Sequence, residues 1–146
     1  MPAIHFSGKQ PLYWASTAAL IPLTEANVPV VNIGEVIVGQ FAERPPAKWP
    51  GTEIETFLAG QLKRSAIEWP GMLLPLVAIQ NIGILFEPEL TVNPTLWLKR
   101  LLKEYHVMLI WEGNYRQPGI FYWANSPNQY LINLAEAAPQ PLLIPQ

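Results

Sequence analysis

The nearly continuous apolar run at residues 72–79, MLLPLVAI, constrains the fold of this chain more than any other segment. Strands with one solvent-facing side alternate apolar and polar residues, whereas strands covered on both faces are apolar throughout. Residues 107–111, VMLIW, repeat this pattern, and residues 28–33, VPVVNI, form a β-branched run that favours a strand. These runs predict a sheet that is buried between two layers of helices.

Helical segments separate the strands. Apolar residues near helical spacing predict a helix over residues 35–44, which two prolines end. A Thr-x-x-Glu capping pattern at Thr52 predicts a helix that runs to about Glu68, and Asn93 followed by proline predicts the cap of a helix that runs to about Tyr105. Strands that alternate with helices predict an α/β fold, a three-layer sandwich with a mostly parallel sheet.

Prolines divide the rest of the chain, and they make up 16 of its 146 residues. Shorter patterns predict four further elements: a first strand at residues 3–6, a short helix at 13–20, a last strand at 120–123 and a short helix at 128–137. We predict a single α/β domain over residues 1–138, followed by a proline-rich, extended C-terminal tail over residues 139–146.

The composition limits the classes of partner. Half of the residues are apolar and 14% are charged, below the roughly 25% of a typical soluble domain, which predicts apolar surface that a protein partner or self-association covers. The nine basic residues are scattered and the net charge is -2, which argues against autonomous nucleic-acid binding. No apolar run approaches the length of a membrane span, so we expect a cytoplasmic protein. The chain has no cysteine, which excludes disulfides and thiol catalysis.

Four segments, in this order, carry a resemblance to a known family: VPVVNIG at residues 28–34, QNIGILFEPELTVNPTLWLKRL at 80–101, VMLIWEG at 107–113 and FYWANSPNQY at 121–130. Together they resemble the small P-loop protein of bacteriophage-exclusion (BREX) defence clusters, in particular its BrxF type. The resemblance implies a P-loop NTPase-like fold. In it the first segment follows the P-loop helix, the second contains the Walker B strand, the third is a sensor strand and the fourth is a terminal strand.

The resemblance also implies that the phosphate loop is degenerate. A Walker A loop has glycines that let backbone amides approach the phosphates, and a lysine that neutralises their charge. Here Gly8 stands at the first glycine, and Tyr13, Trp14 and Ala15 replace the closing Gly-Lys-Thr. Two bulky rings would then occupy the space that the phosphates need.

The Walker B region departs from the family in the same way. The apolar run ends at Gln80 and Asn81, and the resemblance implies an aspartate at Gln80 and a glutamate at Gly83. Neither residue can hold magnesium through a carboxylate or activate water. The family's arginine before the sensor strand falls at Lys103, which lacks the bidentate fork of an arginine. The implied protein is a pseudo-NTPase without catalytic residues, cofactor or metal.

Two of the six tryptophans are candidate interface anchors. Trp49 and Trp69 each precede a Pro-Gly dipeptide, in predicted turns on either side of one helix. Exposed aromatic residues at turns often anchor protein interfaces. The alternative is that both rings fold back over the helix ends.

The predicted function is that of a non-catalytic P-loop-fold protein that acts as a binding or assembly subunit, in an antiviral defence complex as the resemblance implies. One alternative is a small enzyme or nucleotide-binding regulator with a site near His5, His106 and Glu112, because α/β folds place ligands at strand ends. A second alternative is a nucleic-acid accessory protein.

Overall fold

The computed structural model describes Ile4, Phe6 and residues 10–41, 51–87, 90–122 and 131–142. The elements in chain order are β1 (Leu12–Ala15), η1 (Thr17–Ala19), α1 (Leu20–Glu25), β2 (Val30–Asn32), α2 (Ile33–Phe41), α3 (Gly51–Ser65), β3 (Leu76–Gln80), η3 (Ile82–Phe86), α4 (Pro94–Leu101), β4 (His106–Ile110), β5 (Asn114–Arg116), β6 (Ile120–Tyr122), β7 (Leu131–Asn133), η5 (Ala135–Ala137) and β8 (Gln140–Pro141), where η marks a 3-10 helix.

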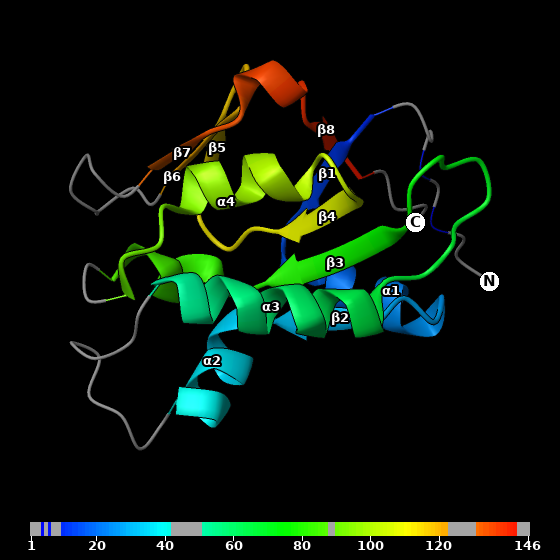
Figure 1. Ribbon diagram of the computed structural model, residues 1–146. Helices are drawn as coiled ribbons and strands as arrows, with labels where there is room; N and C mark the ends of the chain where they lie inside the picture. The colour runs from blue at the N-terminus through cyan, green and yellow to red at the C-terminus, as the bar shows by residue number, and fades with distance from the viewer. Residues whose placement is uncertain are drawn as a thin grey trace.

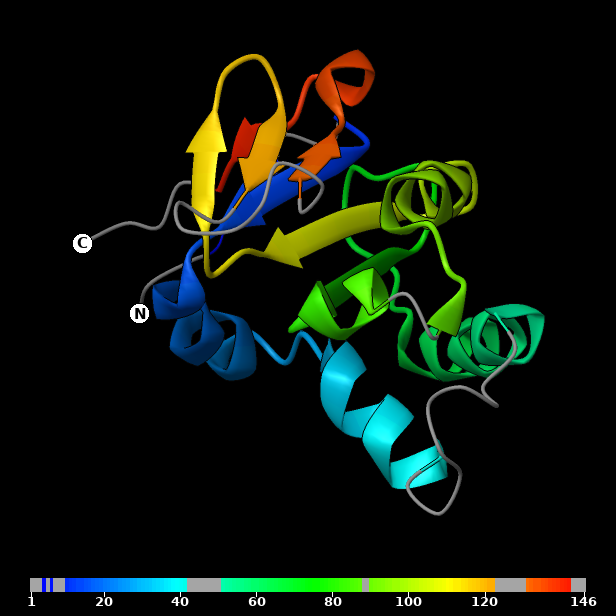
Figure 2. The ribbon, with the colours of Figure 1, turned by 90° about the vertical axis from the view of Figure 1, so that its left-hand side faces the viewer.

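Five parallel strands form the main sheet, in the order β2-β3-β4-β1-β8. Every residue of β4 is buried, as are the first four residues of β3. Figures 1 and 2 show α3 and α4 on one face of this sheet and α1 on the other. The prediction of an α/β fold with a mostly parallel sheet is confirmed, and the layers are compatible with a three-layer sandwich.

A second, antiparallel sheet has the strand order β5-β6-β7. In the sequence it lies between β4 and β8, and in the structure it lies on the same face of the main sheet as α4 (Figure 1). Phe121 of β6 and Ile132 of β7 are completely buried, in one apolar cluster with the side chains of α3 and α4. The strand predicted at residues 120–123 therefore exists, but it belongs to this small sheet.

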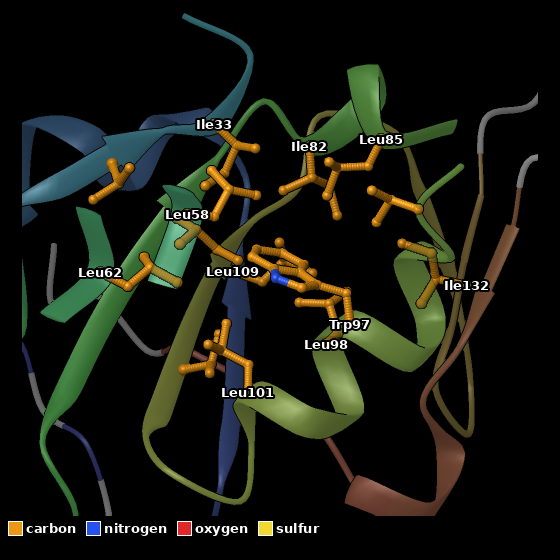
Figure 3. Close-up of a cluster of buried hydrophobic side chains, with 14 of the residues drawn as sticks. Ile33, Leu58, Leu62, Ile82, Leu85, Trp97, Leu98, Leu101, Leu109 and Ile132 are labelled. Atoms are coloured by element: carbon orange, nitrogen blue, oxygen red, sulfur yellow. The ribbon is translucent and has the colours of Figure 1, made fainter. Parts of the chain in front are cut away.

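The hydrophobic core has two parts, one on each face of the main sheet. The larger part lies under α3 and α4, and Figure 3 shows Trp97 at its centre, surrounded by aliphatic side chains. The smaller part lies under α1, and it includes Ile4, Phe6, Leu23 and Leu142. The central strands are buried on both faces, which explains why they are apolar throughout.

Several local predictions are confirmed. Strand β2 and helices α2, α3 and α4 lie within two to four residues of their predicted bounds. The Asn93 side chain caps α4, accepting a hydrogen bond of 3.1 Å from the backbone N–H of Leu96. The capping pattern predicted at Thr52 is wrong, because α3 already includes Gly51 and Thr52, and the Gly51 N–H donates instead to the Thr91 side chain over 3.0 Å. None of the helices within the described ranges combines the length and apolar character needed to cross a membrane.

Other local predictions are wrong. The helix predicted at residues 13–20 is a strand, β1, over its first three residues, because aromatic Tyr13 and Trp14 pair in register with Met108 and Leu109 of β4. Residues 131–137 of the last predicted helix form β7 and η5.

The predicted first strand at residues 3–6 is described only at Ile4 and Phe6. Residues 140–141 of the predicted tail are extended, and they pair with β1 as β8.

Candidate functional site

The carboxyl ends of the parallel strands are the first place to look for a ligand site, because open α/β sheets bind ligands there. The connection after β1 runs through α1 on one face of the sheet, whereas the connection after β3 runs through α4 on the other face. The topological switch point is therefore next to β1. The residues that directly follow the strands at this edge are Ser16 after β1, Ile33 after β2, Asn81 after β3 and Trp111 after β4.

Two asparagines at this edge bind each other and the backbone. The Asn81 side-chain amide donates to Asn32 Oδ1 over 2.9 Å, and the same oxygen accepts a hydrogen bond of 2.9 Å from the backbone N–H of Glu35. The Gly34 N–H donates to the Asn81 carbonyl over 3.0 Å. A Cβ atom at Gly34 would lie 2.5 Å from Asn81 Nδ2, so a larger residue there would displace the Asn81 amide. We call Asn32 and Asn81 the amide lock, and its polar atoms are used to join β2, β3 and the start of α2.

Asn32 was missed in the sequence. Its signal was present, because an asparagine that ends a strand directly before a helix is a common N-cap. Gln80 pairs in register with Asn32, so Gln80 lies beside the amide lock. Side chains that carry no charge therefore occupy the strand end at which the resemblance implies magnesium-binding acids.

The connection after β1 is a tight turn. The Ser16 side chain accepts a hydrogen bond of 3.4 Å from the Ala18 N–H, and the Ala19 N–H donates to the Ser16 carbonyl over 3.0 Å. Residues 16–19 read Ser-Thr-Ala-Ala and contain neither glycine nor lysine.

The predicted phosphate-loop residues lie elsewhere. Tyr13, Trp14 and Ala15 are inside β1, so their rings do not fill a loop after the strand, as the sequence interpretation had them. Tyr13 contacts Phe6 edge-on, and Trp14 stacks on Tyr115 with ring centroids 4.4 Å apart. Gly8 lies outside the described residues.

Lys103 lies near the amino ends of the parallel strands, whereas Gln80 and Asn81 lie at their carboxyl ends. It is exposed and precedes β4, whereas Gln80 ends β3, and the two strands run parallel. The four residue steps from His106 to Ile110 alone span about 13 Å. The structure therefore brings Gln80 and Asn81 together and leaves Lys103 away from them.

The residues of the predicted enzymatic alternative are not brought together either. His106 is buried at the amino end of β4, where its Nδ1 lies 2.8 Å from the Gln10 carbonyl oxygen; a carbonyl only accepts, so Nδ1 carries the proton. Glu112 is exposed beyond the carboxyl end of the same strand, and His5 lies outside the described residues. Among the residues that the structure describes, no three His, Asp or Glu side chains are placed to hold a metal ion.

The two predicted interface tryptophans have different outcomes. Trp69 is half-buried, and its ring meets Phe6 edge-on with centroids 5.3 Å apart, so it does fold back on the core. Trp49 lies outside the described residues. A neighbour of Trp69 is exposed instead: the side chain of Leu73 is 96% accessible and that of Leu74 is 37% accessible.

These leucines were predicted to be buried in the strand over residues 72–79, which is wrong for its first four residues. A turn precedes the strand, in which the Met72 N–H donates to the Trp69 carbonyl over 3.1 Å, and an antiparallel bridge from Ile67 to Leu76 sets where β3 begins. We call residues 68–75 the leucine loop. Seven of its residues line a cavity of about 540 Å³: Glu68, Trp69, Pro70, Met72, Leu73, Leu74 and Pro75.

A second cavity, of about 500 Å³, lies between α4 with its following turn and η5. We call it the α4–η5 groove. Its lining combines apolar residues with three cations and one acid: Pro11, Leu96, Leu102, Leu134 and Ala137, then Lys99, Arg100 and Lys103, then Glu136. Sequence reasoning missed this groove because η5 and α4 are more than thirty residues apart in the chain.

A scan against models of known protein families, a search of curated proteins and a search of solved structures each gave no match to this chain. The interpretation of its function therefore depends on the two cavities, the amide lock and the turn after β1.

Proposed function

We propose that this protein is a cytoplasmic, non-catalytic binding subunit built on a degenerate P-loop-type sheet, and that it works by binding a protein partner. The observation that carries the proposal is the chemistry of the carboxyl edge. The turn after β1 has no glycine or lysine, and the Asn81 amide after β3 donates to Asn32 Oδ1 at the end of β2, while its carbonyl accepts from the Gly34 N–H. Phosphoryl transfer needs positive charge on the phosphates and a carboxylate on magnesium.

The P-loop part of the proposal is supported by the order of the elements. The segments that resemble the BREX family contain β2, the end of β3 with α4, and β4, and these strands are parallel neighbours in one sheet. A place in an antiviral defence complex is the biological context that this resemblance implies.

The partner-binding part is supported by the exposed apolar surface. Leu73 is 96% accessible, and it projects from a loop whose other apolar residues line a cavity. Burying a large aliphatic side chain is favourable by about 1.5–3 kcal/mol relative to leaving it in water. A partner, or a second copy of this chain, that covers the leucine loop would recover it.

We expect no heat of binding when ATP and Mg²⁺ are titrated into the protein in a calorimeter. The amide lock has no carboxylate for the metal, and the turn after β1 offers no phosphate cradle. Titration of a functional P-loop ATPase under the same conditions gives the positive control. Binding at micromolar affinity that Gln80→Ala abolishes would contradict the non-catalytic assignment.

Leu73→Asp is expected to leave the free energy of unfolding within about 0.5 kcal/mol of the parent, because a side chain this exposed makes few contacts. It should weaken association, because a charge in a covered apolar contact must be desolvated. Sedimentation velocity over a concentration series measures self-association, and affinity capture with the two proteins side by side compares bound partners.

Ile21→Asp is the matched control, because Ile21 is 70% accessible and lies in α1. If both variants lose association equally, the effect belongs to net charge. If neither changes it, the leucine loop is not the contact surface.

A further inference from the structure

The α4–η5 groove gathers positive charge on a chain that is negative overall. Among the described residues, three cations line it, Lys99, Arg100 and Lys103, against one acid, Glu136, which gives a formal charge of 3 - 1 = +2. The formal charge of the whole chain is -2. This clustering is the opposite of the scattered basic residues that the sequence suggested.

The cations and the apolar wall come from one helical face. Leu96, Lys99, Arg100 and Lys103 are spaced i, i+3, i+4 and i+7, which places them in a row along α4 and the turn after it. Leu96 is 50% accessible although it is a leucine, and Leu134 and Ala137 face it from the side of η5. The groove thus offers an apolar floor flanked by ammonium and guanidinium groups.

The ion pairs within the groove leave these cations open to a ligand. Lys99 Nζ lies 4.0 Å from Glu136 Oε2, with the two side chains 41% and 89% accessible. Arg100 pairs with Glu55 of α3, and those side chains are 54% and 30% accessible. Exposed pairs of this kind are weak, so a ligand carboxylate can replace either partner. Lys103 has no acidic partner among the described residues.

We infer that the α4–η5 groove binds an acidic amphipathic segment of a protein partner, with an aliphatic side chain of that segment on the Leu96–Leu134 floor and its carboxylates on Lys99 and Lys103. This inference rests on the proposed function, because it names the chemistry of the partner. The cavity volume of about 500 Å³ is in the range of pockets that hold small ligands and single anchoring side chains.

A nucleic-acid strand fits the groove less well. Its phosphates would use the three cations but would leave the apolar floor uncovered, and Glu136 would repel them. Single-strand binding sites add aromatic rings on which bases stack, and none of the described residues that line the groove is aromatic.

Binding can be measured by fluorescence anisotropy with a labelled helical peptide that has leucines at i, i+4 and i+7 and glutamates elsewhere. Two matched probes complete the set, one with the leucines replaced by serine and one with the glutamates replaced by lysine. We expect saturable binding of the first peptide alone, and weaker binding as the salt concentration rises, because exposed charges are screened.

The double variant Lys99→Glu and Lys103→Glu is expected to weaken binding about tenfold or more, since two attractive charge pairs become repulsive. Leu96→Ala should weaken it severalfold through the apolar contact. The control is Lys63→Glu with Arg64→Glu, which makes the same change in net charge in the last turn of α3. Positive charge in a last helical turn also stabilises the helix, so thermal unfolding of both double variants separates stability from binding. If the groove variant does not fold, the corresponding glutamine variant is used.

Each of three peptide results would overturn the inference: no binding of the acidic peptide, equal binding of the lysine probe, or equal weakening by the α3 control. Retention of a single-stranded oligonucleotide that competes with the peptide would reassign the groove to nucleic acid and would also overturn it. None of these results changes the expected calorimetry with ATP or the leucine-loop measurements. The peptide measurements therefore test the groove, whereas the calorimetry and the leucine-loop variants test the proposed function.

Discussion

Replacing Phe121 with alanine is expected to lower the free energy of unfolding by about 3–5 kcal/mol, the usual cost of removing a buried phenylalanine. Phe121 is completely buried, and its ring lies 5.0 Å from that of Tyr115, 5.7 Å from Trp111 and 6.0 Å from Trp14, measured between centroids. These rings come from β1, from β5 and from the segment after β4. Phe121 therefore joins the small sheet to the main sheet, and urea unfolding followed by circular dichroism measures its contribution.

Tyr122→Ala is the matched control, because Tyr122 is the next residue of β6 and points to the other face. It is half-buried, and its ring has Arg116 5.8 Å above it, a contact that contributes about 0.5–1 kcal/mol. Phe121→Leu keeps most of the volume and should be intermediate. Equal losses for Phe121→Ala and Tyr122→Ala would contradict the role given to the aromatic cluster.

Gly119→Ala is expected to lower the free energy of unfolding by about 2–4 kcal/mol, the sum of a steric overlap and a weakened hydrogen bond. A Cβ atom there would lie 2.7 Å from the Cα of Ala135, 2.8 Å from its nitrogen and 2.9 Å from the Leu134 carbonyl carbon. All three are backbone atoms, which cannot rotate away as a side chain would. The hydrogen bond of 2.8 Å from the Leu134 N–H to the Gly119 carbonyl would also be displaced.

The control for this variant lies in α3. A Cβ atom at Gly60 would meet only the end of the Arg64 side chain, at 3.7 Å. Gly60→Ala should therefore stabilise the protein by about 0.5–1 kcal/mol, because alanine is the better helix former. Thermal unfolding of the two variants should shift in opposite directions, and a loss of stability in both would show that the contacts at Gly119 are not the cause.

The buried strands and their helices could be predicted from the sequence because their signals are local. The run at residues 107–111 is apolar at every position, and Asn93 before a proline marks the start of α4. Of the small sheet only β6 was predicted, as a strand of the main sheet, because β5, β6 and β7 have three residues each. Runs this short have no measurable period, and their strand state depends on partners across the hairpins.

The site was predicted less well than the fold. The position of Gln80 and Asn81 at a strand end was recognisable, but the phosphate-loop comparison was displaced because Tyr13, Trp14 and Ala15 lie in the strand Leu12–Ala15 and not in a loop. The exposure of Leu73 depends on the turn at Trp69 and on the bridge from Ile67 to Leu76. The α4–η5 groove forms only when Pro11, α4 and η5 come together in the fold. These three parts are far apart in the sequence, so a local pattern cannot predict the groove.

The position of β1 inside the sheet has a consequence for how the chain assembles during synthesis. Leu12 pairs with Val107, 107 - 12 = 95 residues later, and Tyr13 also pairs with Gln140, 140 - 13 = 127 residues later. Strand β1 is synthesised early, and both of its backbone edges stay unpaired until β4 and β8 have left the ribosome. Such late, long-range pairing slows folding and leaves edges open to aggregation. A nascent chain that stops before β4 should accordingly depend on chaperones.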